Sequence, residues 1–300
     1  MTPLPSPVRK AVVPIAGLGT RHFPASHAVK KELFPVVGPD GIGRALFHYH
    51  LIELVKARIG DICLVVQPGE EETIRNYLKG PGDGYLRRLE KHPHLLEEAL
   101  HMAELSEHVT FAVQKAQAGY GHAVFQARAF ASGDPVLLCL GDHLFRGSPE
   151  SPYGILSRMW SHSEGLSVSA VNRIPASDLK GYGTIAGRRK KDHPELIDIS
   201  LIIEKPELAV AREKLRVDGL GEEEFLGWFG MHLLSPSIFS ILEEMIHDDV
   251  RDNGEFQLTR AQEIQREREG YLALEMTGAE RFDFGLPDDY LASLGRFRQG

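Results

Sequence analysis

The chain has 300 residues, enough for one large domain or two modest ones. Apolar residues make up 42% of it and charged residues 25%, which is ordinary for a globular protein and argues against disorder, collagen and membrane spans. The formal net charge is −8, so we expect neither nucleic acid nor an anionic membrane as a partner.

The two cysteines, Cys63 and Cys139, both lie in short apolar runs. Such runs are typical of buried strands, in which a thiol stays reduced. No apolar run approaches the roughly 18 residues that a membrane-spanning helix needs. This use of cysteine predicts a cytoplasmic protein.

The apolar pattern predicts strands that alternate with helices along the chain. In the first half, strands are predicted over 11–16, 61–67, 109–113 and 136–140, helices over 44–59, 70–79 and 121–131, and a polar helical insertion between 80 and 108. In the second half, strands are predicted over 166–171, 197–203 and 225–234, and helices over 236–246, 255–269 and 288–298. This alternation is typical of a mostly parallel sheet with helices on both faces, where ligands bind beyond the carboxyl ends of the strands.

A glycine-containing loop, Ala16-Gly17-Leu18-Gly19-Thr20-Arg21, follows the first predicted strand. Glycines there allow backbone N–H groups to approach a phosphate, and Arg21 adds a planar, permanent positive charge. The loop is not a dinucleotide fingerprint, because the sixth position counted from Gly17 is His22 and not glycine, and it is not a Walker loop, because no Gly-Lys-Ser/Thr follows. Lys31 is a second cation placed to share a polyphosphate with Arg21. A tight turn and a solvated surface lysine are the alternatives.

Carboxylates and a lysine follow other predicted strands. Asp142 follows the apolar run 136–140, and Asp283 follows a short apolar stretch late in the chain. Two carboxylates, completed by phosphate oxygens and water, suit octahedral Mg²⁺, whereas an aspartate that caps a turn is the alternative. Glu204 and Lys205 close a β-branched run, where a surface ion pair is the alternative to ligand binding.

Together these segments resemble the signature of the sugar-1-phosphate nucleotidyltransferases. The glycine loop is followed by Pro24-Ala25, Lys31-Glu32 and Pro35, and six further motifs come in the expected order. They are Gln114 with Gly119-Tyr120-Gly121-His122-Ala123, Leu140-Gly141-Asp142, Gly181-Tyr182-Gly183, Glu204-Lys205-Pro206, Gly254-Glu255-Phe256-Gln257-Leu258-Thr259 and Phe282-Asp283-Phe284-Gly285. The resemblance extends over nearly the whole chain. The insertion between 80 and 108 resembles the uridylyltransferases of this family more than the shorter thymidylyltransferases.

The resemblance implies a Rossmann-like three-layer α/β/α fold with a mixed, mostly parallel central sheet. It implies a single nucleotidyltransferase domain over 1–300, with a nucleotide-binding core over 8–150 and a sugar-phosphate-binding part with the C-terminal helices over 151–300. The activity it implies is Mg²⁺-dependent transfer from UTP to α-D-glucose 1-phosphate, giving UDP-glucose and pyrophosphate. It also implies a homodimer or homotetramer.

The resemblance also assigns roles to single residues. It implies catalytic roles for Arg21, Lys31, Asp142 and Lys205, and metal binding by Asp142 and Asp283. It implies nucleotide binding by Ala16, Gly17, Gly19, Thr20, Gln114 and Gly119, with the Gln114 amide pairing with the pyrimidine edge. It implies sugar-phosphate binding by Tyr182, Gly183, Glu204 and Lys205, the lysine on the phosphate and the glutamate on sugar hydroxyls.

Other functions stay open at this point. Uracil and thymine differ by one methyl group, which an apolar pocket discriminates by only about 1–3 kcal/mol, so a thymidylyltransferase or an enzyme for another hexose 1-phosphate is an alternative. A nucleotide-sugar-binding regulator with weak or no turnover is an alternative from another class. His27 and Lys30 stand where the uridylyltransferases usually carry a lysine and a proline, so we expect altered triphosphate contacts.

Overall fold

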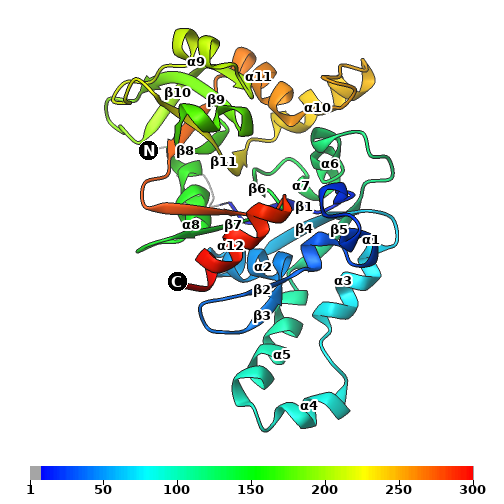
Figure 1. The fold of residues 1–300 in the computed structure, drawn as a ribbon. Helices are drawn as coiled ribbons and strands as arrows, with labels where there is room; N and C mark the ends of the chain where they lie inside the picture. The colour runs from blue at the N-terminus through cyan, green and yellow to red at the C-terminus, as the bar shows by residue number, and fades with distance from the viewer. Residues whose placement is uncertain (1–7, 300) are drawn as a thin grey trace, which may run out of the picture.

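A computed structural model describes residues 8–299, and its centre is one large mixed sheet. The strands of this sheet are β1 (Lys10–Pro14), β4 (Asp61–Val66), β5 (Val109–Val113), β6 (Val136–Cys139), β8 (Val168–Pro175), β9 (Gly183–Arg189), β10 (Leu196–Glu204), β11 (Glu224–Leu234) and β12 (Leu272–Glu275). They are arranged in the order β5-β4-β1-β6-β11-β8-β12-β10-β9, with a further pairing of β11 with β9 (Figure 1).

The strand directions confirm a mixed, mostly parallel sheet. Strands β5, β4, β1 and β6 pair in parallel, as do β8 and β12. Strands β10 and β11 run antiparallel to their neighbours. In the described part of the chain, seven of the nine strands of this sheet therefore point in one direction, and their carboxyl ends share one edge.

Helices cover both faces of this sheet, and two short hairpins lie beside it. The α-helices are α1 (Ala25–Ala28), α2 (Leu46–Lys56), α3 (Glu70–Leu78), α4 (Asp83–Leu89), α5 (Pro93–Ser106), α6 (Tyr120–Phe125), α7 (Arg128–Ala131), α8 (Pro152–Arg158), α9 (Leu208–Lys214), α10 (Ser237–His247), α11 (Leu258–Glu269) and α12 (Pro287–Gln299). Short 3-10 turns are η1 (Thr20–His22), η2 (Lys31–Leu33), η3 (Met159–His162) and η4 (Ala176–Gly181). The hairpins pair β2 (Pro35–Val37) with β3 (Gly43–Ala45) and β7 (His143–Gly147) with β13 (Ala279–Asp283).

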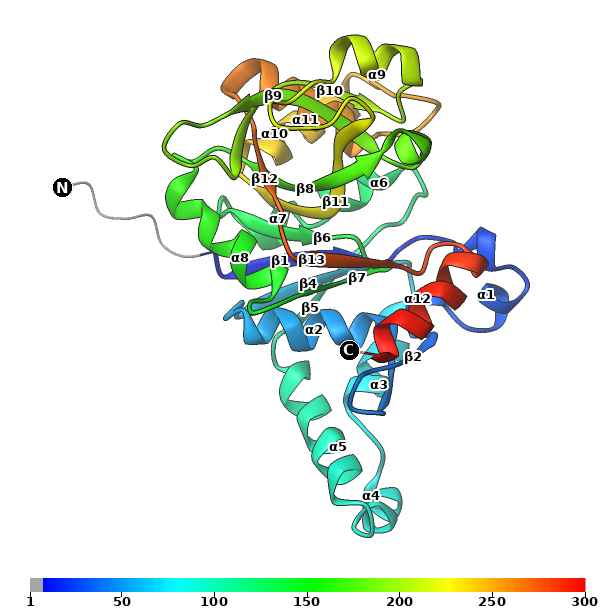
Figure 2. The ribbon, with the colours of Figure 1, turned by 60° about the vertical axis from the view of Figure 1, so that its left-hand side comes forward.

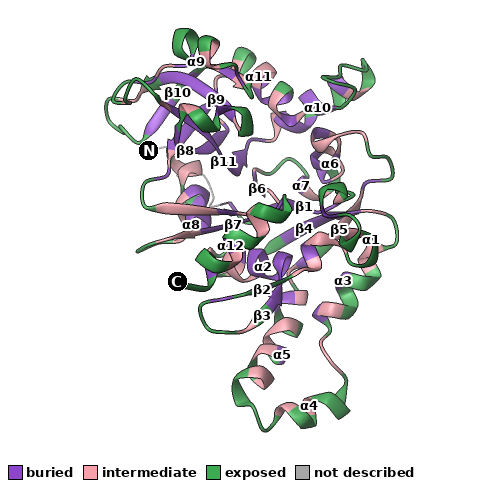
Figure 3. Ribbon diagram, in the orientation of Figure 1, coloured by how far each residue is buried: buried purple, intermediate pink, exposed green. Residues whose placement is uncertain are grey.

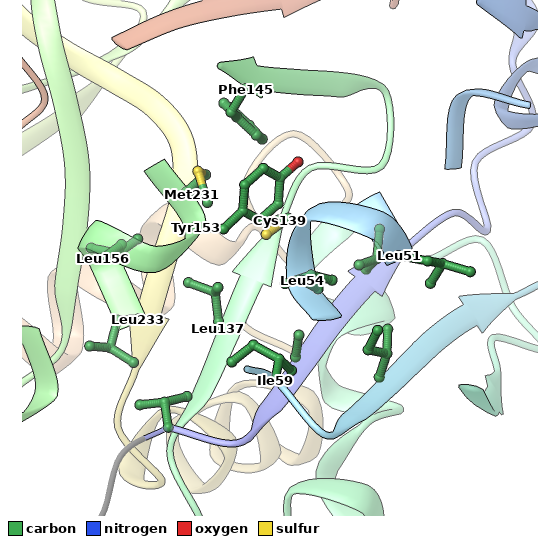
Figure 4. Packing of buried hydrophobic residues seen from close by; sticks show 14 of the residues in the cluster. Leu51, Leu54, Ile59, Leu137, Cys139, Phe145, Tyr153, Leu156, Met231 and Leu233 are labelled. Atoms are coloured by element: carbon green, nitrogen blue, oxygen red, sulfur yellow. The ribbon is translucent and has the colours of Figure 1, made fainter. Parts of the chain in front are cut away.

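The alternation of side chains along the strands builds two apolar cores. In β1, Ala11 and Val13 join one core, while Val12 joins the other. The first core packs α2 and α8 against the sheet, and Figure 4 shows Leu51 and Leu54 of α2 and Leu137 of β6 among its members. The second core packs α6, α10 and α11 against the opposite face. The three-layer arrangement expected from the sequence is therefore confirmed.

The predicted insertion between 80 and 108 forms α4 and α5. Figures 1 and 2 show both helices projecting away from the sheet, and Figure 3 shows α4 mostly exposed and α5 with a mixture of exposed and intermediate residues. Helix α4 buries no residue, and α5 buries only Ala99 and Leu105. Within residues 8–299, no helix combines the length and the apolar character required to cross a membrane.

Several boundaries differ from the predictions. The helix predicted over 44–59 starts as strand β3, and the helix predicted over 121–131 divides into α6 and α7. Strands β2, β7, β9, β12 and β13 were not predicted. The pairing of β7 with β13 joins segments more than 130 residues apart, so the local apolar period carries no sign of it.

Candidate active site

A cleft of about 1000 Å³ is lined by residues that follow β6, precede or begin β9 and end or follow β10. The antiparallel pairing of β10 with β9 brings the end of one strand beside the start of the other, so residues from distant segments meet there. Seven predicted site residues line this cleft: Arg21, Asp142, Tyr182, Gly183, Glu204, Lys205 and Asp283. The catalytic, metal and sugar-phosphate residues expected from the sequence therefore converge on this cleft. Lys31 is the exception, because it does not line the cleft and contacts only Asp142 there.

The two predicted metal ligands are joined by a histidine. Asp142 follows β6, and the hairpin register places Asp283 of β13 opposite His143 of β7. His143 Nδ1 lies 2.7 Å from Asp142 Oδ1, and its Nε2 lies 3.2 Å from Asp283 Oδ2. The Phe284 N–H also donates to the Asp142 carbonyl oxygen at 2.9 Å. His143 was not among the predicted site residues, although it stands directly after Asp142.

Opposite charges keep this cluster ionised. Burial acts to raise the pKa of Asp142, but His143 and Lys31 outweigh it and hold that pKa well below its ordinary value. Burial also acts against ionisation of Asp283, and the hydrogen bond from His143 lowers its pKa overall. The same two carboxylates raise the pKa of His143 against the effect of burial. The site therefore holds two ionised carboxylates that are paired with basic groups of the chain.

Asp142 and Asp283 border one small space at Gly285. A Cβ atom on Gly285 would lie 3.0 Å from Asp283 Oδ1 and 3.1 Å from Asp142 Oδ2. Both carboxylates thus border the one small space that the missing side chain leaves. Hard oxygen ligands of this kind are those that Mg²⁺ prefers, so the donor set fits the predicted metal.

The glycine loop brings one arginine to the cleft, and the segment after it brings one lysine to Asp142. Arg21 lies in η1, is exposed and lines the cleft. Lys31 Nζ lies 2.6 Å from Asp142 Oδ2. Lys30 points elsewhere, because its Nζ lies 2.9 Å from Glu70. The neighbouring His27 is exposed and its ring stands 6.4 Å from that of Phe23, so of these basic residues only Arg21 and Lys31 reach the site.

The predicted sugar-phosphate residues lie at the start of β9 and the end of β10. The register pairs Gly183 with Glu204, and Thr259 Oγ1 donates to Glu204 Oε2 at 3.1 Å. Lys205 adopts a left-handed backbone with a φ of +47°, which is strained for a residue with a side chain and is typical of functional sites. Its N–H donates to the Tyr182 carbonyl oxygen at 3.0 Å.

An arginine that the sequence analysis missed holds the tyrosine of this region. Arg281 of β13 donates to the Tyr182 hydroxyl and stacks on its ring, with its guanidinium carbon 4.3 Å from the ring centre. Arg281 and Asp283 are two residues apart on one strand and both line the cleft. Residues two apart on a strand point to the same face, so Asp283 could have indicated Arg281 as a site residue if β13 had been predicted as a strand.

The predicted nucleotide-binding residues form a separate group beside the cleft. Ala16, Gly17, Gly19, Thr20, Gln114 and Gly119 are not among the residues that line it. The buried Gln114 donates its amide to the Gly119 carbonyl oxygen at 3.1 Å. Two glutamines that the sequence analysis missed bind the loop carbonyls: Gln117 donates to Ala16 at 3.1 Å and Gln67 to Gly17 at 3.3 Å.

Comparison with known proteins gives a consistent result over the whole chain. Residues 10–295 match the Nucleotidyl transferase family. A UTP–glucose-1-phosphate uridylyltransferase of Bacillus subtilis is 31% identical over 286 residues, covering 93% of this chain and 87% of that protein. UTP–glucose-1-phosphate uridylyltransferase 1 of Staphylococcus saprophyticus is 27% identical, covering 95% of each chain.

Solved structures agree in fold. A UTP-bound UGPase from Acinetobacter baumannii has a TM-score of 0.75 at 27% identity and covers 97% of this chain and 93% of its own. A UDP-glucose pyrophosphorylase complexed with UDP-glucose has a TM-score of 0.76 at 22% identity, covers 97% of this chain and 98% of its own, and supports the fold alone. On the family match over residues 10–295, this chain belongs to the Nucleotidyl transferase family.

Proposed function

We propose that the protein transfers the uridylyl group of UTP to α-D-glucose 1-phosphate and forms UDP-glucose and pyrophosphate. The observation that carries this proposal is the cleft, which brings Arg21, Asp142, Asp283 and the Glu204–Lys205 pair together from distant parts of the chain. The names of the curated relatives, all UTP–glucose-1-phosphate uridylyltransferases, support the choice of both substrates.

The reaction needs positioning and charge stabilisation rather than a protein base. An oxygen of the sugar phosphate attacks the α-phosphorus of UTP in line, and the bond from that phosphorus to the bridging oxygen of pyrophosphate breaks. The attacking oxygen is already anionic, so no proton has to leave it. Lys205 holds the attacking phosphate, while Arg21 and Lys31 neutralise the triphosphate as charge moves to the leaving group.

The pyrimidine nucleotide binds at the group of residues beside the cleft. Ala16, Gly17, Gly19, Thr20 and Gly119 supply backbone contacts there, and the Gln114 amide reads the base edge. Gln114 now donates to Gly119, and Gln67 and Gln117 donate to loop carbonyls. A bound nucleotide exchanges these internal hydrogen bonds for its own, so nucleotide binding reorganises the loop.

Tyr182, Gly183 and Glu204 hold the hexose, with the Glu204 carboxylate accepting hydrogen bonds from its hydroxyls. Asp142 and Asp283 would hold Mg²⁺, and the ion would supply charge stabilisation for the phosphate oxygens. The ionised state of both carboxylates and the space above Gly285 support this choice.

The remaining expectations are part of the same proposal. One domain contains a nucleotide-binding core over 8–150 and a sugar-phosphate-binding part over 151–300, and the single sheet includes strands of both. The protein forms a homodimer or homotetramer and acts in the cytoplasm, where the buried free thiols of Cys63 and Cys139 stay reduced.

The test is pyrophosphate release from a matrix of UTP, dTTP, CTP, ATP and GTP against several hexose 1-phosphates, with and without Mg²⁺. We expect the strongest signal from UTP with glucose 1-phosphate in the presence of Mg²⁺. A different best pair would replace the substrates and keep the reaction. Folded protein that binds UDP-glucose in a calorimeter but turns over no pair would overturn the enzyme and favour a regulator.

A further inference from the structure

Trp228 carries a buried indole N–H that has no partner. Its side chain lines the cleft and is 8% exposed, yet its Nε1 has no hydrogen bond within residues 8–299. Asn172 Oδ1 and the Tyr120 hydroxyl oxygen are also buried atoms without a hydrogen bond in this part of the chain, and both residues line the cleft. Buried polar groups of tryptophan and tyrosine usually find a partner. Three such atoms around one cleft therefore point to a polar ligand that supplies the missing hydrogen bonds.

The position of the indole relates it to the hexose part of the cleft. A Cβ atom on Gly183 would lie 2.4 Å from Trp228 Cδ1, 2.6 Å from Trp228 Nε1 and 2.7 Å from Glu204 Oε2. The nitrogen and the carboxylate oxygen thus approach the same point above Gly183, and only a residue without a side chain permits this. The donor of Trp228 therefore stands beside the acceptor of Glu204.

The backbone around Trp228 fixes the ring in this place. The pairing of β11 with β8 changes register between Trp228 and His232, and Gly230 between them has a φ of +101°. Such a bulge re-aims side chains and is common beside active sites. The rings of Trp228 and His232 meet edge to face at 5.6 Å. Arg281 donates to the Trp228 carbonyl oxygen at 3.4 Å. The indole is therefore an ordered wall of the cleft.

We propose that Trp228 is a specificity-determining residue for the hexose. Its N–H donates to a hydroxyl oxygen of the sugar while Glu204 accepts from a hydroxyl beside it, so donor and acceptor read the sugar together. The N–H is shielded from water in the free protein, so this contact requires the bound hexose to displace the groups that cover it. This proposal rests on the proposed function, because it takes the ligand to be a hexose 1-phosphate.

Fluorescence tests the contact without relying on turnover. The chain has two tryptophans, and the other, Trp160 in η3, packs against the first core away from the cleft lining. In Trp160→Phe, we expect α-D-glucose 1-phosphate to cause a saturable change in Trp228 emission. In Trp228→Phe, the remaining Trp160 gives no change. Binding seen by calorimetry with unchanged Trp228 emission would overturn the proposal, even if Trp228→Phe does not fold.

Kinetics with deoxy sugars test the hydrogen bond. For glucose 1-phosphate with UTP, we expect Trp228→Phe to lower kcat/KM about tenfold and to change the KM for UTP less than about twofold. For the one deoxy analogue that lacks the hydroxyl bound by Trp228, we expect wild type and Trp228→Phe to have equal kcat/KM. The control Trp160→Phe should have the kcat/KM of wild type with every sugar. The proposal is overturned if Trp228→Phe discriminates against every deoxy analogue as strongly as wild type. Wild type that is inactive with all pairs would instead contradict the proposed function.

Discussion

Lys31 Nζ lies 2.6 Å from Asp142 Oδ2, while His143 Nδ1 lies 2.7 Å from Asp142 Oδ1. Both oxygens of the first predicted metal ligand are therefore paired with basic groups of the chain itself. A triphosphate offers Lys31 another anionic partner, and its arrival would release one Asp142 oxygen for a metal ion. Nucleotide binding and metal binding would then favour each other through this lysine.

Replacement of Asp142 tests the centre of this arrangement. In Asp142→Ala, we expect the rate of uridylyl transfer to fall by about a thousandfold or more, because the metal and Lys31 lose their shared partner. Initial rates of pyrophosphate release across a Mg²⁺ titration measure this. Asp134→Ala is the matched control, because Asp134 is an exposed residue that precedes β6 whereas Asp142 follows it. Near-normal turnover by folded Asp142→Ala would rule out the assignment of Asp142 as metal ligand.

Lys205 should act mainly on the sugar phosphate. A hydrogen bond to a charged group contributes about 1.5–3 kcal/mol, so Lys205→Ala is expected to raise the KM for glucose 1-phosphate about 10- to 100-fold. The KM for UTP should change little. Lys214→Ala, at the exposed end of α9, serves as the control for loss of a surface lysine. An unchanged KM for glucose 1-phosphate in Lys205→Ala would contradict the role given to this residue.

Gly183 is required by the close approach of Trp228 and Glu204. In Gly183→Ala, the new Cβ would lie 2.4 Å from Trp228 Cδ1, so we expect about 1–3 kcal/mol of lost stability and a weaker interaction with the hexose. Gly181→Ala is the matched control, since a Cβ there meets nothing within 4 Å. Denaturant melts and the KM for glucose 1-phosphate measure both effects. Equal behaviour of the two variants would show that the space above Gly183 is not used.

The sequence was informative wherever a motif followed a buried strand. Asp142, Glu204 and Lys205 come directly after apolar runs, and the folded chain brings them into one cleft. The apolar run before Asp142 predicted β6, because a strand buried on both faces is apolar over its whole length. The order of the motifs then predicted the family.

The missed residues depend on contacts between distant segments. Arg281 lies on β13, which pairs with β7, and the register of that hairpin also places His143 against Asp283. The orientation of the Trp228 ring depends on a bulge in β11 and on the close approach of Gly183 from the neighbouring strand β9. No local pattern encodes a register between strands far apart, so these residues became visible only in the folded chain.

Glu32 gives the protein a pH-dependent stability that a single substitution removes. Its side chain is buried beneath Lys30 and Lys31, with its oxygens 3.7 and 3.8 Å from their ammonium groups. Burial raises the pKa of Glu32 to about 7 from an ordinary 4.5, although both lysines act to lower it. Because the folded protein holds this proton more tightly than the unfolded chain, stability decreases as the pH rises from 4.5 to 7.

We therefore expect the difference in free energy of unfolding between Glu32→Gln and wild type to change with pH. Relative to wild type, the free energy of unfolding of Glu32→Gln should increase by about 1.4 kcal/mol per pH unit between pH 4.5 and 7, to a total on the order of 3 kcal/mol. Above pH 7 the difference should stay constant. Urea melts of both proteins at pH 5, 6, 7 and 8 measure this. A difference that is the same at all four pH values would mean that Glu32 keeps an ordinary pKa, and that the lysines compensate fully for its burial.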